Sequence, residues 1–403
     1  MSNRLISPAE AEAAIREHAT RLPAVRMPLA ELAGTVLRES ITATRDQPPF
    51  DRVTMDGIAF AFESWQDGRS SFRIAGTQAA GAAPLTLRDP GECIEVMTGA
   101  MLPAGCNCVV PVENIEVRDG VAQLRDDAPA PVRNFNVHAR GIDSRRGDLL
   151  LASGCRLGPP EVAVIASNNQ SHALVTRSPK IVVISTGDEL VEPGKPLLDW
   201  QISRSNVFAV LASLRQHGYS ALSQDHLADD LETLRTRLRQ HLDANDVLIL
   251  SGGVSMGRFD FVPQVLQELG VRMVFHKVAQ RPGKPIWFGV GAGGQTVYAL
   301  PGNPVSTLVC LTRYVLPGLL AAQGVAPAAV ETIALTQSYE VKPSLAVFLP
   351  VKLAHDVAGQ CAAPHPTQGS GDFTSLMGTL GFVELPPGPR VVTEDISLPL
   401  YRW

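Results

Sequence analysis

The sequence lacks the paired ligands that mark a zinc site. None of its cysteines stands in a CxxC pair, and its nine histidines form no cluster with zinc-ligand spacing. Cys106 and Cys108 are two residues apart and would share one face of a strand, which leaves a two-cysteine site open. Buried or incidental thiols are the favoured interpretation, and scattered thiols fit a reducing cytoplasm. The six cysteines are Cys93, Cys106, Cys108, Cys155, Cys310 and Cys361.

The sequence also lacks a long apolar run and a basic charge balance. No stretch of about 18 apolar residues occurs, and residues 1–10 hold no basic segment followed by an apolar run. We therefore expect neither a membrane span nor a signal peptide. The formal net charge is -5, whereas nucleic-acid-binding chains are more often clearly basic. These absences favour a cytoplasmic protein that binds neither nucleic acid nor membrane.

An ordinary globular composition is what the sequence does have. Of its 403 residues, 45% are hydrophobic and 19% are charged, which is enough apolar surface for a folded core. A chain of this length is expected to form about two to four domains. It contains no internal repeat and no low-complexity tract.

Helix signals stand near the start of the chain. Ser7 can cap a helix, Pro8 suits the first helical position, and Glu10 lies three residues after the serine. A helix is therefore expected to about His18. A second short helix is expected from Leu29 to Leu37.

The texture of the sequence then changes three times. Residues 47–137 alternate glycine, proline and short β-branched runs, which indicates a small β-rich domain. Continuous apolar strands at 181–184 and 247–250 enclose helical periodicity at 231–242, which predicts a parallel sheet covered on both faces. Residues 326–403 form short strand-like runs joined by turns, typical of a small β-barrel or sandwich.

Glycine-rich and proline-rich turns occur at strand ends, where open α/β sheets bind ligands. Ser251-Gly252-Gly253 can expose backbone N–H groups to an oxyanion. Arg281-Pro282-Gly283-Lys284-Pro285 adds cations, and Pro301-Gly302-Asn303-Pro304 precedes an apolar run where a helix could begin. Each turn alone could be a capped turn or a solvated loop. Together they predict an anionic ligand with phosphate groups and metal assistance.

Six motifs in order resemble those of the molybdopterin molybdenumtransferase family, which includes the bacterial MoeA proteins and the gephyrin E domain. The stretch PPFDRVTMDG resembles the family's PPFDxSxMDGYA, MTGAMLPAG resembles TGAxxPxG, and ISTGDEL matches outright. SGGVSMGRFD, RPGKP and LPGNPVS are close matches in the family's order. The resemblance runs from about Pro8 to the C-terminus.

The resemblance implies a multidomain α/β plus β architecture in four parts. Residues 1–46 with 145–178 would form a helical and extended N-terminal domain, and 47–144 a β-rich insert domain. Residues 179–325 would form a molybdopterin-binding α/β domain with a parallel-rich sheet, and 326–403 a small C-terminal β-barrel. A homodimer is implied as well.

The activity that the resemblance implies is a late step of molybdenum cofactor biosynthesis. Family members insert molybdate into adenylated molybdopterin and release AMP, with a divalent metal such as Mg²⁺. The implied protein partners are a molybdopterin adenylyltransferase and apo-molybdoenzymes.

The resemblance also implies a site rich in carboxylates and oxyanion donors. Catalytic positions would be Asp56, Thr98, Asp143, Asp188, Asp229, Asp260 and Lys277. Molybdate- and phosphate-binding positions would be Ser251, Gly252, Gly253, Arg281, Lys284, Pro301, Asn303, Ser306 and Ser370. Carboxylates beside a pyrophosphate repel it unless a divalent cation lies between them, so Asp188 and Asp260 are the expected Mg²⁺ ligands.

Several positions depart from the family's pattern. The family's C-terminal arginine falls on Pro350, and its Ala-Asn pair falls on Thr379-Leu380. A further family arginine falls on His138, and a lysine falls on Arg281. Losing a desolvated site arginine could weaken anion binding by several kcal/mol.

Two lysines, Lys342 and Lys352, are candidates to replace the missing arginine. The departures support an alternative function, that of a divergent paralogue that binds molybdopterin or its nucleotide as a carrier with weak or no insertion. Adenylyl transfer onto molybdopterin and a scaffold role are further alternatives.

Overall fold

The structure is a computed structural model that describes residues 5–253, 261–342, 344–356, 359–369 and 371–403. The chain divides into two compact units. Unit 1 comprises Met1–Arg38, Gly154–Gly158 and Leu174–Trp403, and unit 2 comprises Glu39–Ser153 and Pro159–Ala173. The finer division into four domains stays a prediction.

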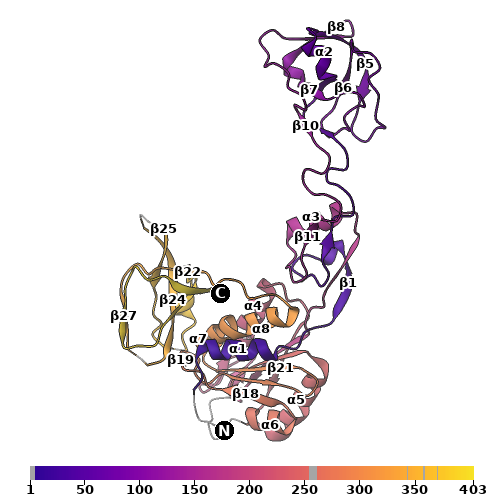
Figure 1. Ribbon diagram of the computed structural model, residues 1–403. Helices are drawn as coiled ribbons and strands as arrows, with labels where there is room; N and C mark the ends of the chain where they lie inside the picture. The colour runs from indigo at the N-terminus through magenta and orange to yellow at the C-terminus, as the bar shows by residue number, and fades with distance from the viewer. Residues whose placement is uncertain (1–4, 254–260, 343, 357–358, 370) are drawn as a thin grey trace. The chain divides into compact units, whose positions relative to one another are not determined.

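A six-stranded mixed sheet lies at the centre of unit 1 (Figure 1). Its first four strands run parallel to one another, and the fifth runs antiparallel to both of its neighbours, the fourth and the sixth. The parallel-rich sheet expected from the continuous apolar strands is thus confirmed. The strand order is β16 (Leu222–Leu227), β13 (Ile181–Thr186), β17 (Val247–Ser251), β21 (Thr296–Leu300), β20 (Trp287–Val290) and β18 (Arg272–His276).

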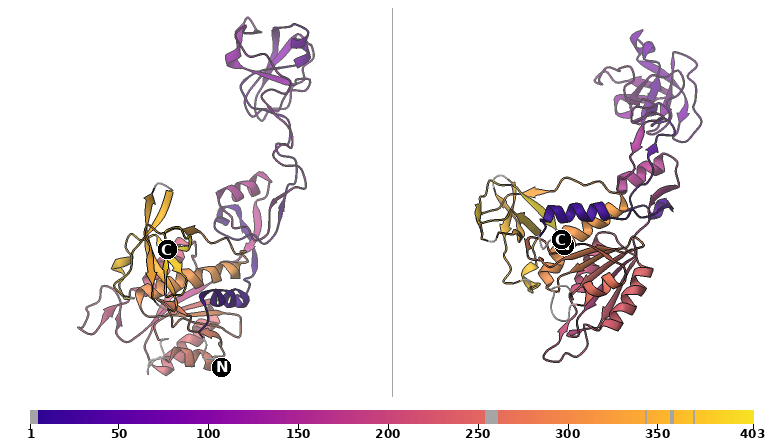
Figure 2. Two further views of the ribbon diagram at one scale, coloured as in Figure 1. Left: turned by 60° about the vertical axis from the view of Figure 1, so that its left-hand side comes forward. Right: turned by 60° about the horizontal axis from the view of Figure 1, so that its bottom comes forward.

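Helices cover both faces of this sheet (Figure 2). Val183 and Ile249 point into one core, and their neighbours Val182 and Leu248 point into the other, because successive strand residues face opposite sides. The first core also contains residues of α1 (Pro8–His18), α4 (Asn206–Gln216), α7 (Pro304–Cys310), the π-helical turn η3 (Leu311–Val315) and α8 (Leu316–Gln323). The second contains residues of α5 (Leu231–Ala244) and α6 (Val262–Glu268).

One helical segment of the described chain, Pro304–Gln323, is long and apolar enough to cross a membrane by length and composition alone. Within the protein, 78% of its most apolar window is buried. Its side chains join the core shared with α1 and the sheet. This burial is what the core helix of a folded domain requires.

The first predicted helix is confirmed and the second is wrong. Ser7 and Glu10 form the reciprocal capping box at the start of α1, which ends at His18. In the second segment only a 3₁₀ turn, η1 (Leu29–Glu31), is helical. Gly34 adopts a positive φ of 81°, and Leu37 then pairs with Val175. The apolar side chains are buried by extended pairing instead of a helix face.

The C-terminal part of unit 1 is a second sheet. Its order is β19 (Gln280–Arg281), β24 (Ala346–Asp356), β26 (Gly381–Leu385), β28 (Leu398–Arg402) and β22 (Thr332–Ile333), with β25 (Gly359–Pro364) beside β24. Leu335, after β22, bridges to Ala362 in β25, so the sheet curls back on itself. A separate ribbon pairs β23 (Tyr339–Val341) with β27 (Arg390–Val392). Strand β19 contains Arg281, the first residue of the basic turn at residues 281–285. Its pairing with β24 therefore places this turn at one edge of the C-terminal sheet.

Unit 2 is built around a six-stranded sheet, which agrees with the predicted β-rich segment. Its order is β7 (Cys108–Pro111), β4 (Gly57–Phe60), β6 (Glu92–Val96), β5 (Ser71–Gln78), β9 (Val121–Leu124) and β8 (Ile115–Arg118). Gly57 lies so close to β7 that an added Cβ would stand 2.0 Å from the Val110 carbonyl oxygen. Only glycine fits there, which gives the glycine of the MDG motif a structural role.

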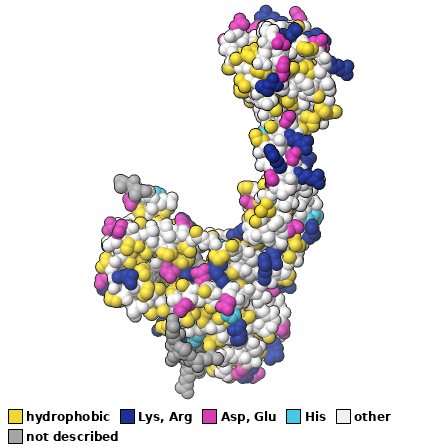
Figure 3. Space-filling model, viewed as in Figure 1, with side chains coloured by type: hydrophobic (Ala, Val, Ile, Leu, Met, Phe, Trp, Pro, Cys, Tyr) yellow, Lys and Arg dark blue, Asp and Glu magenta, His cyan; other side chains and the backbone are white. Residues whose placement is uncertain are grey.

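The remaining elements are short. They are β1 (Ala24–Pro28), β2 (Ile41–Thr42), β3 (Arg52–Val53), α2 (Phe62–Gln66), η2 (Val112–Asn114), β10 (Val137–His138), β11 (Leu149–Leu151), α3 (Pro159–Ser167), β12 (His172–Thr176), β14 (Leu190–Val191), β15 (Ile202–Ser203) and η4 (Thr374–Leu376). On the face of unit 1 seen in Figure 3, basic and acidic side chains are interspersed.

The thiols of unit 2 are buried. Cys93, Cys106 and Cys108 lie in apolar cores, and burial raises their pKa values to about 12, about 12 and about 11. At neutral pH they are protonated and poor metal ligands. Among the described residues, no group of three or more His, Cys, Asp or Glu side chains could hold a metal ion.

Candidate functional site

The turn that carries Arg281 and Lys284 is held from behind by buried polar side chains. Gln280, which is fully buried, donates from Nε2 to the Pro282 carbonyl at 3.1 Å and accepts from the Tyr314 hydroxyl. Gly283 has a φ of 90°, and an added Cβ would lie 2.6 Å from Cys310 Sγ. The turn therefore has one available shape, which fixes where its two cations project.

These cations line a cavity of about 660 Å³ between the α/β sheet and the C-terminal sheet. Five residues predicted to bind molybdate or phosphate stand around it, namely Arg281, Lys284, Pro301, Asn303 and Ser306. Their types, two cations with an amide and a hydroxyl, suit a tetrahedral oxyanion. Ser370 lies outside the described residues, but Gly369 beside it in the chain lines the same cavity.

Pro350 also lines this cavity, from within β24. The position where the family has an arginine thus faces the predicted oxyanion site and is uncharged here. Of the two candidate replacements, Lys342 lines the cavity and Lys352 does not. Lys342 is exposed and lies 3.7 Å from Glu340, so its ammonium group can move toward an anion at little cost.

A second, smaller cavity of about 110 Å³ lies where β13 and β17 end. Ser251 and Gly252 line it, as the motif predicted, whereas Gly253 does not. An added Cβ at Gly252, where φ is 103°, would lie 2.6 Å from the Thr186 carbonyl oxygen. Asn206 Nδ2 donates to Ser251 Oγ at 2.9 Å and to the Gly302 carbonyl at 2.7 Å, which ties the walls together.

The Pro301–Pro304 turn separates the two cavities. Pro301 and Asn303 line the larger one, and Gly302 and Pro304 line the smaller one. Helix α7 starts directly after this turn, as predicted. A ligand with two anionic parts could therefore touch this one turn from both sides.

The predicted acidic residues of unit 1 are partly brought together. Asp188 is exposed just beyond the end of β13, and its Oδ1 accepts from the Asp229 N–H at 3.2 Å. Asp260 lies outside the described residues. Lys277 lies after β18 with a φ of 72°, is half-buried, and lines neither cavity.

The predicted residues of unit 2 form two small groups. The N–H and the hydroxyl of Thr98 both donate to Asp56 Oδ1 at 2.6 Å, and the hydroxyl bond and then the N–H bond lower the pKa of Asp56. His138 Nε2 lies 3.0 Å from Asp143 Oδ1, and its Nδ1 lies 3.2 Å from Arg52 Nη2. Because Arg52 can only donate, Nδ1 accepts and Nε2 carries the hydrogen. His138, which stands where the family pattern has an arginine, therefore accepts from Arg52 and donates to Asp143.

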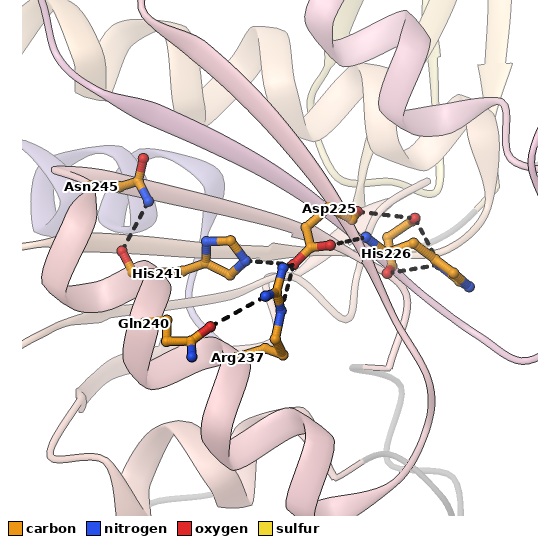
Figure 4. Close-up of polar contacts among 7 residues, drawn as sticks. Asp225, His226, Arg237, Gln240, His241 and Asn245 are labelled. Carbon is orange, nitrogen blue, oxygen red and sulfur yellow. Dashed lines mark hydrogen bonds and ion pairs between the residues drawn. The ribbon is translucent and has the colours of Figure 1, made fainter.

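A polar network behind the smaller cavity was missed by the sequence analysis (Figure 4). Ser185, on the cavity wall, lies with its Oγ 3.1 Å from His226 Nδ1. The neighbouring Asp225 accepts from Arg237 Nη2 at 2.6 Å and from His241 Nε2 at 2.7 Å. Partial burial acts to raise the pKa of Asp225, but the bonds from His241 and Arg237 outweigh it, and the pKa is lowered.

Ser185 belongs to the ISTGDEL motif, but the other members gave no motif-level signal. They come from β16 (Asp225, His226) and α5 (Arg237, His241) and meet only in the folded sheet. Asn206 could have been noticed, since Ser205-Asn206 precedes an apolar helical run as a capping pair would. Arg204, which also lines the smaller cavity, gave no such signal.

Asp225→Asn is expected to lower the free energy of unfolding by about 2 kcal/mol at pH 7, because it weakens two charge-assisted bonds. Since the folded-state pKa of Asp225 is lowered, its contribution is present above the unfolded carboxyl pKa and is lost as pH falls through the folded pKa. Urea midpoints at pH 7 and below pH 4 measure the difference. Asp243→Asn, on the exposed side of α5, is the matched control and should change neither midpoint. Equal midpoints for Asp225→Asn and Asp243→Asn at pH 7 would contradict this assignment.

Comparison with known proteins identifies the family of this chain. A family model described as the MoeA N-terminal region (domain I and II) matches residues 6–168, and one described as a probable molybdopterin binding domain matches residues 182–321. A protein named molybdopterin molybdenumtransferase from Synechocystis sp. is 39% identical over 401 residues, which cover 99% of this chain and 100% of the relative. One of the same name from Staphylococcus epidermidis is 28% identical and covers 96% of this chain and 92% of the relative.

Solved structures show the same fold. A molybdopterin biosynthesis MoeA protein from Pyrococcus horikoshii superimposes with a TM-score of 0.77 at 30% identity and covers 99% of both chains. A second structure of that name from the same organism gives a TM-score of 0.80 at 23% identity, covering 99% of this chain and 100% of the other. The chain therefore belongs to the MoeA family of molybdopterin molybdenumtransferases, enzymes of molybdenum cofactor biosynthesis.

Proposed function

We propose that this protein inserts molybdate into adenylated molybdopterin and releases AMP. The observation that carries the proposal is that Arg281, Lys284, Asn303 and Ser306 line one cavity beside the phosphate-type cavity at the ends of β13 and β17. Molybdate is a tetrahedral dianion, and preorganised cations and hydroxyls are what such an ion needs. In this proposal the larger cavity holds molybdate, and the smaller one holds phosphate of the nucleotide. The protein would act as a cytoplasmic homodimer.

The residues present are compatible with the divalent cation that the family implies. Asp188 is exposed at the carboxyl end of β13, beside the smaller cavity's Glu189. Mg²⁺ keeps several waters and needs only one or two protein carboxylates, so the exposed Asp188 suits it, and Asp260, the other predicted ligand, lies outside the described residues. When bound, Mg²⁺ would neutralise charge on the phosphoanhydride as AMP leaves. The protein's own residues would position the two anions, molybdate in the larger cavity and phosphate in the smaller one, relative to each other.

The carrier alternative rests mainly on Pro350 and Leu380. Pro350 removes one cation from the larger cavity, but three described cations, Arg281, Lys284 and Lys342, still line it. The experiment that separates the two functions measures nucleotide binding and AMP release on the same preparation with Mg²⁺. An insertion enzyme turns over many equivalents of nucleotide. Tight binding with no release under any divalent metal would instead establish the carrier.

Asp188→Asn is expected to raise the Mg²⁺ concentration needed for half-maximal AMP release by at least about tenfold. Losing even an outer partner of a metal ligand costs roughly 10–100-fold in affinity, and Asp188 is proposed as a ligand itself. Asp199→Asn, an exposed carboxylate on the segment between β14 and β15, is the control and should leave the titration unchanged. An unchanged Mg²⁺ titration in Asp188→Asn would remove Asp188 from the proposed metal site.

A further inference from the structure

A positively charged side chain in the smaller cavity lies outside every motif. Arg204 follows β15 and lines this cavity together with the hydroxyl-bearing residues Ser185, Thr186 and Ser251. Its Nε atom is buried and has no hydrogen-bond partner among the described residues. A guanidinium is always charged and has only donors, so burying an unpaired N–H is unfavourable unless an acceptor occupies the cavity.

Two further buried polar atoms on the same wall are unpaired. Thr186 is only 3% exposed, and its Oγ1 has no hydrogen-bond partner within the described chain. The same is true of Asn206 Oδ1, although the Nδ2 of that amide donates to Ser251 and Gly302. Buried polar atoms are nearly always satisfied in folded proteins. Three unsatisfied atoms around one small cavity therefore indicate a polar ligand.

The start of helix α4 adds to the positive character of the cavity. Ser205, Asn206 and Val207 all line it, and the Ser205 side chain makes no capping hydrogen bond. The first turn of this 11-residue helix thus lacks a side-chain cap for N–H groups that carry partial positive charge. Phosphate groups bind readily at such uncapped helix ends.

The charge balance of the cavity makes Arg204 the deciding residue. Glu189 also lines the cavity, and it is the one carboxylate among the described residues that do so. Without Arg204 this carboxylate would repel an anion, and only the N–H dipoles of the first turn of α4 would counteract that repulsion. The guanidinium offsets that charge and offers a planar fork of N–H groups that matches two phosphate oxygens.

We propose that Arg204 binds a phosphoryl group of the nucleotide substrate in this cavity, with the hydroxyl of Thr186 and the first turn of α4 as further donors. The identity of the nucleotide rests on the proposed function. The assignment of a phosphate to Arg204 rests on the unpaired atoms and the charge of the cavity.

The test uses ADP, which carries the adenosine and the pyrophosphate group of the proposed substrate. Its dissociation constant is measured by isothermal titration calorimetry on the full chain at low ionic strength. Arg204→Gln should weaken ADP binding by about tenfold or more, because one charge-assisted interaction is lost. Arg204→Lys should bind with intermediate affinity, since it keeps the charge and loses the fork.

Two more variants make the test specific. Arg215→Gln removes an exposed arginine from the last turn of the same helix α4 and should bind ADP as the wild type does. Glu189→Gln removes the opposing carboxylate and should tighten binding. If Arg204→Gln fails to fold by circular dichroism, the tighter binding of Glu189→Gln and the weaker binding of Arg204→Lys still decide the matter.

Equal ADP affinity in wild type and a folded Arg204→Gln variant would overturn the inference, as would a wild type that binds neither ADP nor inorganic pyrophosphate. AMP release, measured on the same proteins, separates this result from the proposed function. A wild type that binds ADP through Arg204 but releases no AMP would contradict the proposed function and support the inference. Full AMP release by an Arg204→Gln variant with unchanged ADP binding would support the proposed function and contradict the inference.

Discussion

Lys284→Ala is expected to slow molybdate-dependent AMP release by about 100-fold or more and to raise the molybdate concentration that the reaction needs. A preorganised charge beside a reacting anion is worth about 10²–10³ in rate, since it needs no reorganisation when the reaction occurs. Lys284 lines the larger cavity from a turn that Gln280 and Gly283 hold in one shape. Initial rates at saturating nucleotide, with molybdate titrated, measure both effects.

The chain carries its own matched control for this variant. The tetrapeptide Pro-Gly-Lys-Pro occurs at residues 282–285 and again at residues 193–196. The two glycines have similar φ values, 90° at Gly283 and 88° at Gly194, and both lysines are exposed, but Lys284 lines the larger cavity and Lys195 lines neither cavity. Lys195→Ala should therefore keep the wild-type rate. A full rate in Lys284→Ala, or an equal loss in both variants, would show that the lysine in the cavity has no special role.

Arg313→Met is expected to lower the free energy of unfolding of unit 1 by about 3–5 kcal/mol, the usual effect of removing one partner from a buried ion pair. Arg313 is 4% exposed, and it bonds Glu12 of α1 at 2.5 Å and Glu384 of β26 at 3.0 Å. Its guanidinium also lies 4.8 Å from the centre of the Tyr401 ring. Removing it leaves the partly buried Glu384 without its cation and removes the link between α1 and the C-terminal sheet.

The urea midpoint of the transition that includes α1 measures this loss at pH 7. Arg16→Ala is the control, because Arg16 bonds the same Glu12 from the solvent side of α1 at 3.0 Å. An i,i+4 pair of this exposure contributes about 0.5 kcal/mol or less. Similar midpoints for Arg313→Met and Arg16→Ala would mean that Arg313 does not link α1 to the C-terminal sheet as described.

Local patterns predicted those parts of the fold that local physics decides. The capping residues of α1 and the continuous apolar runs of β13 and β17 each specify one structure, and the structure has them. The segment after Leu29 was predicted wrongly, because apolar spacing alone cannot tell a helix face from residues buried by extended pairing. Gly34 was the signal for a break.

The candidate site was predictable to the extent that its residues sit in turns with their own sequence signature. The basic turn at Arg281 and the turn at Pro301 fall around one cavity, as their positions at strand ends suggested. Arg204, Asn206 and Asp225 could not be predicted in the same way, because their surroundings depend on how distant strands are ordered in the sheet. Only the folded chain shows that Arg204 Nε is buried and has no hydrogen-bond partner among the described residues.

The most direct test of the central claim is AMP release from adenylated molybdopterin in the presence of Mg²⁺, measured with and without molybdate. We expect release to depend on molybdate and to give a product that restores activity to an apo-molybdoenzyme. That result would also show that Lys342 and the two cations of the basic turn suffice without an arginine at Pro350. Release that is indifferent to molybdate, or a product that restores no activity, would contradict the account.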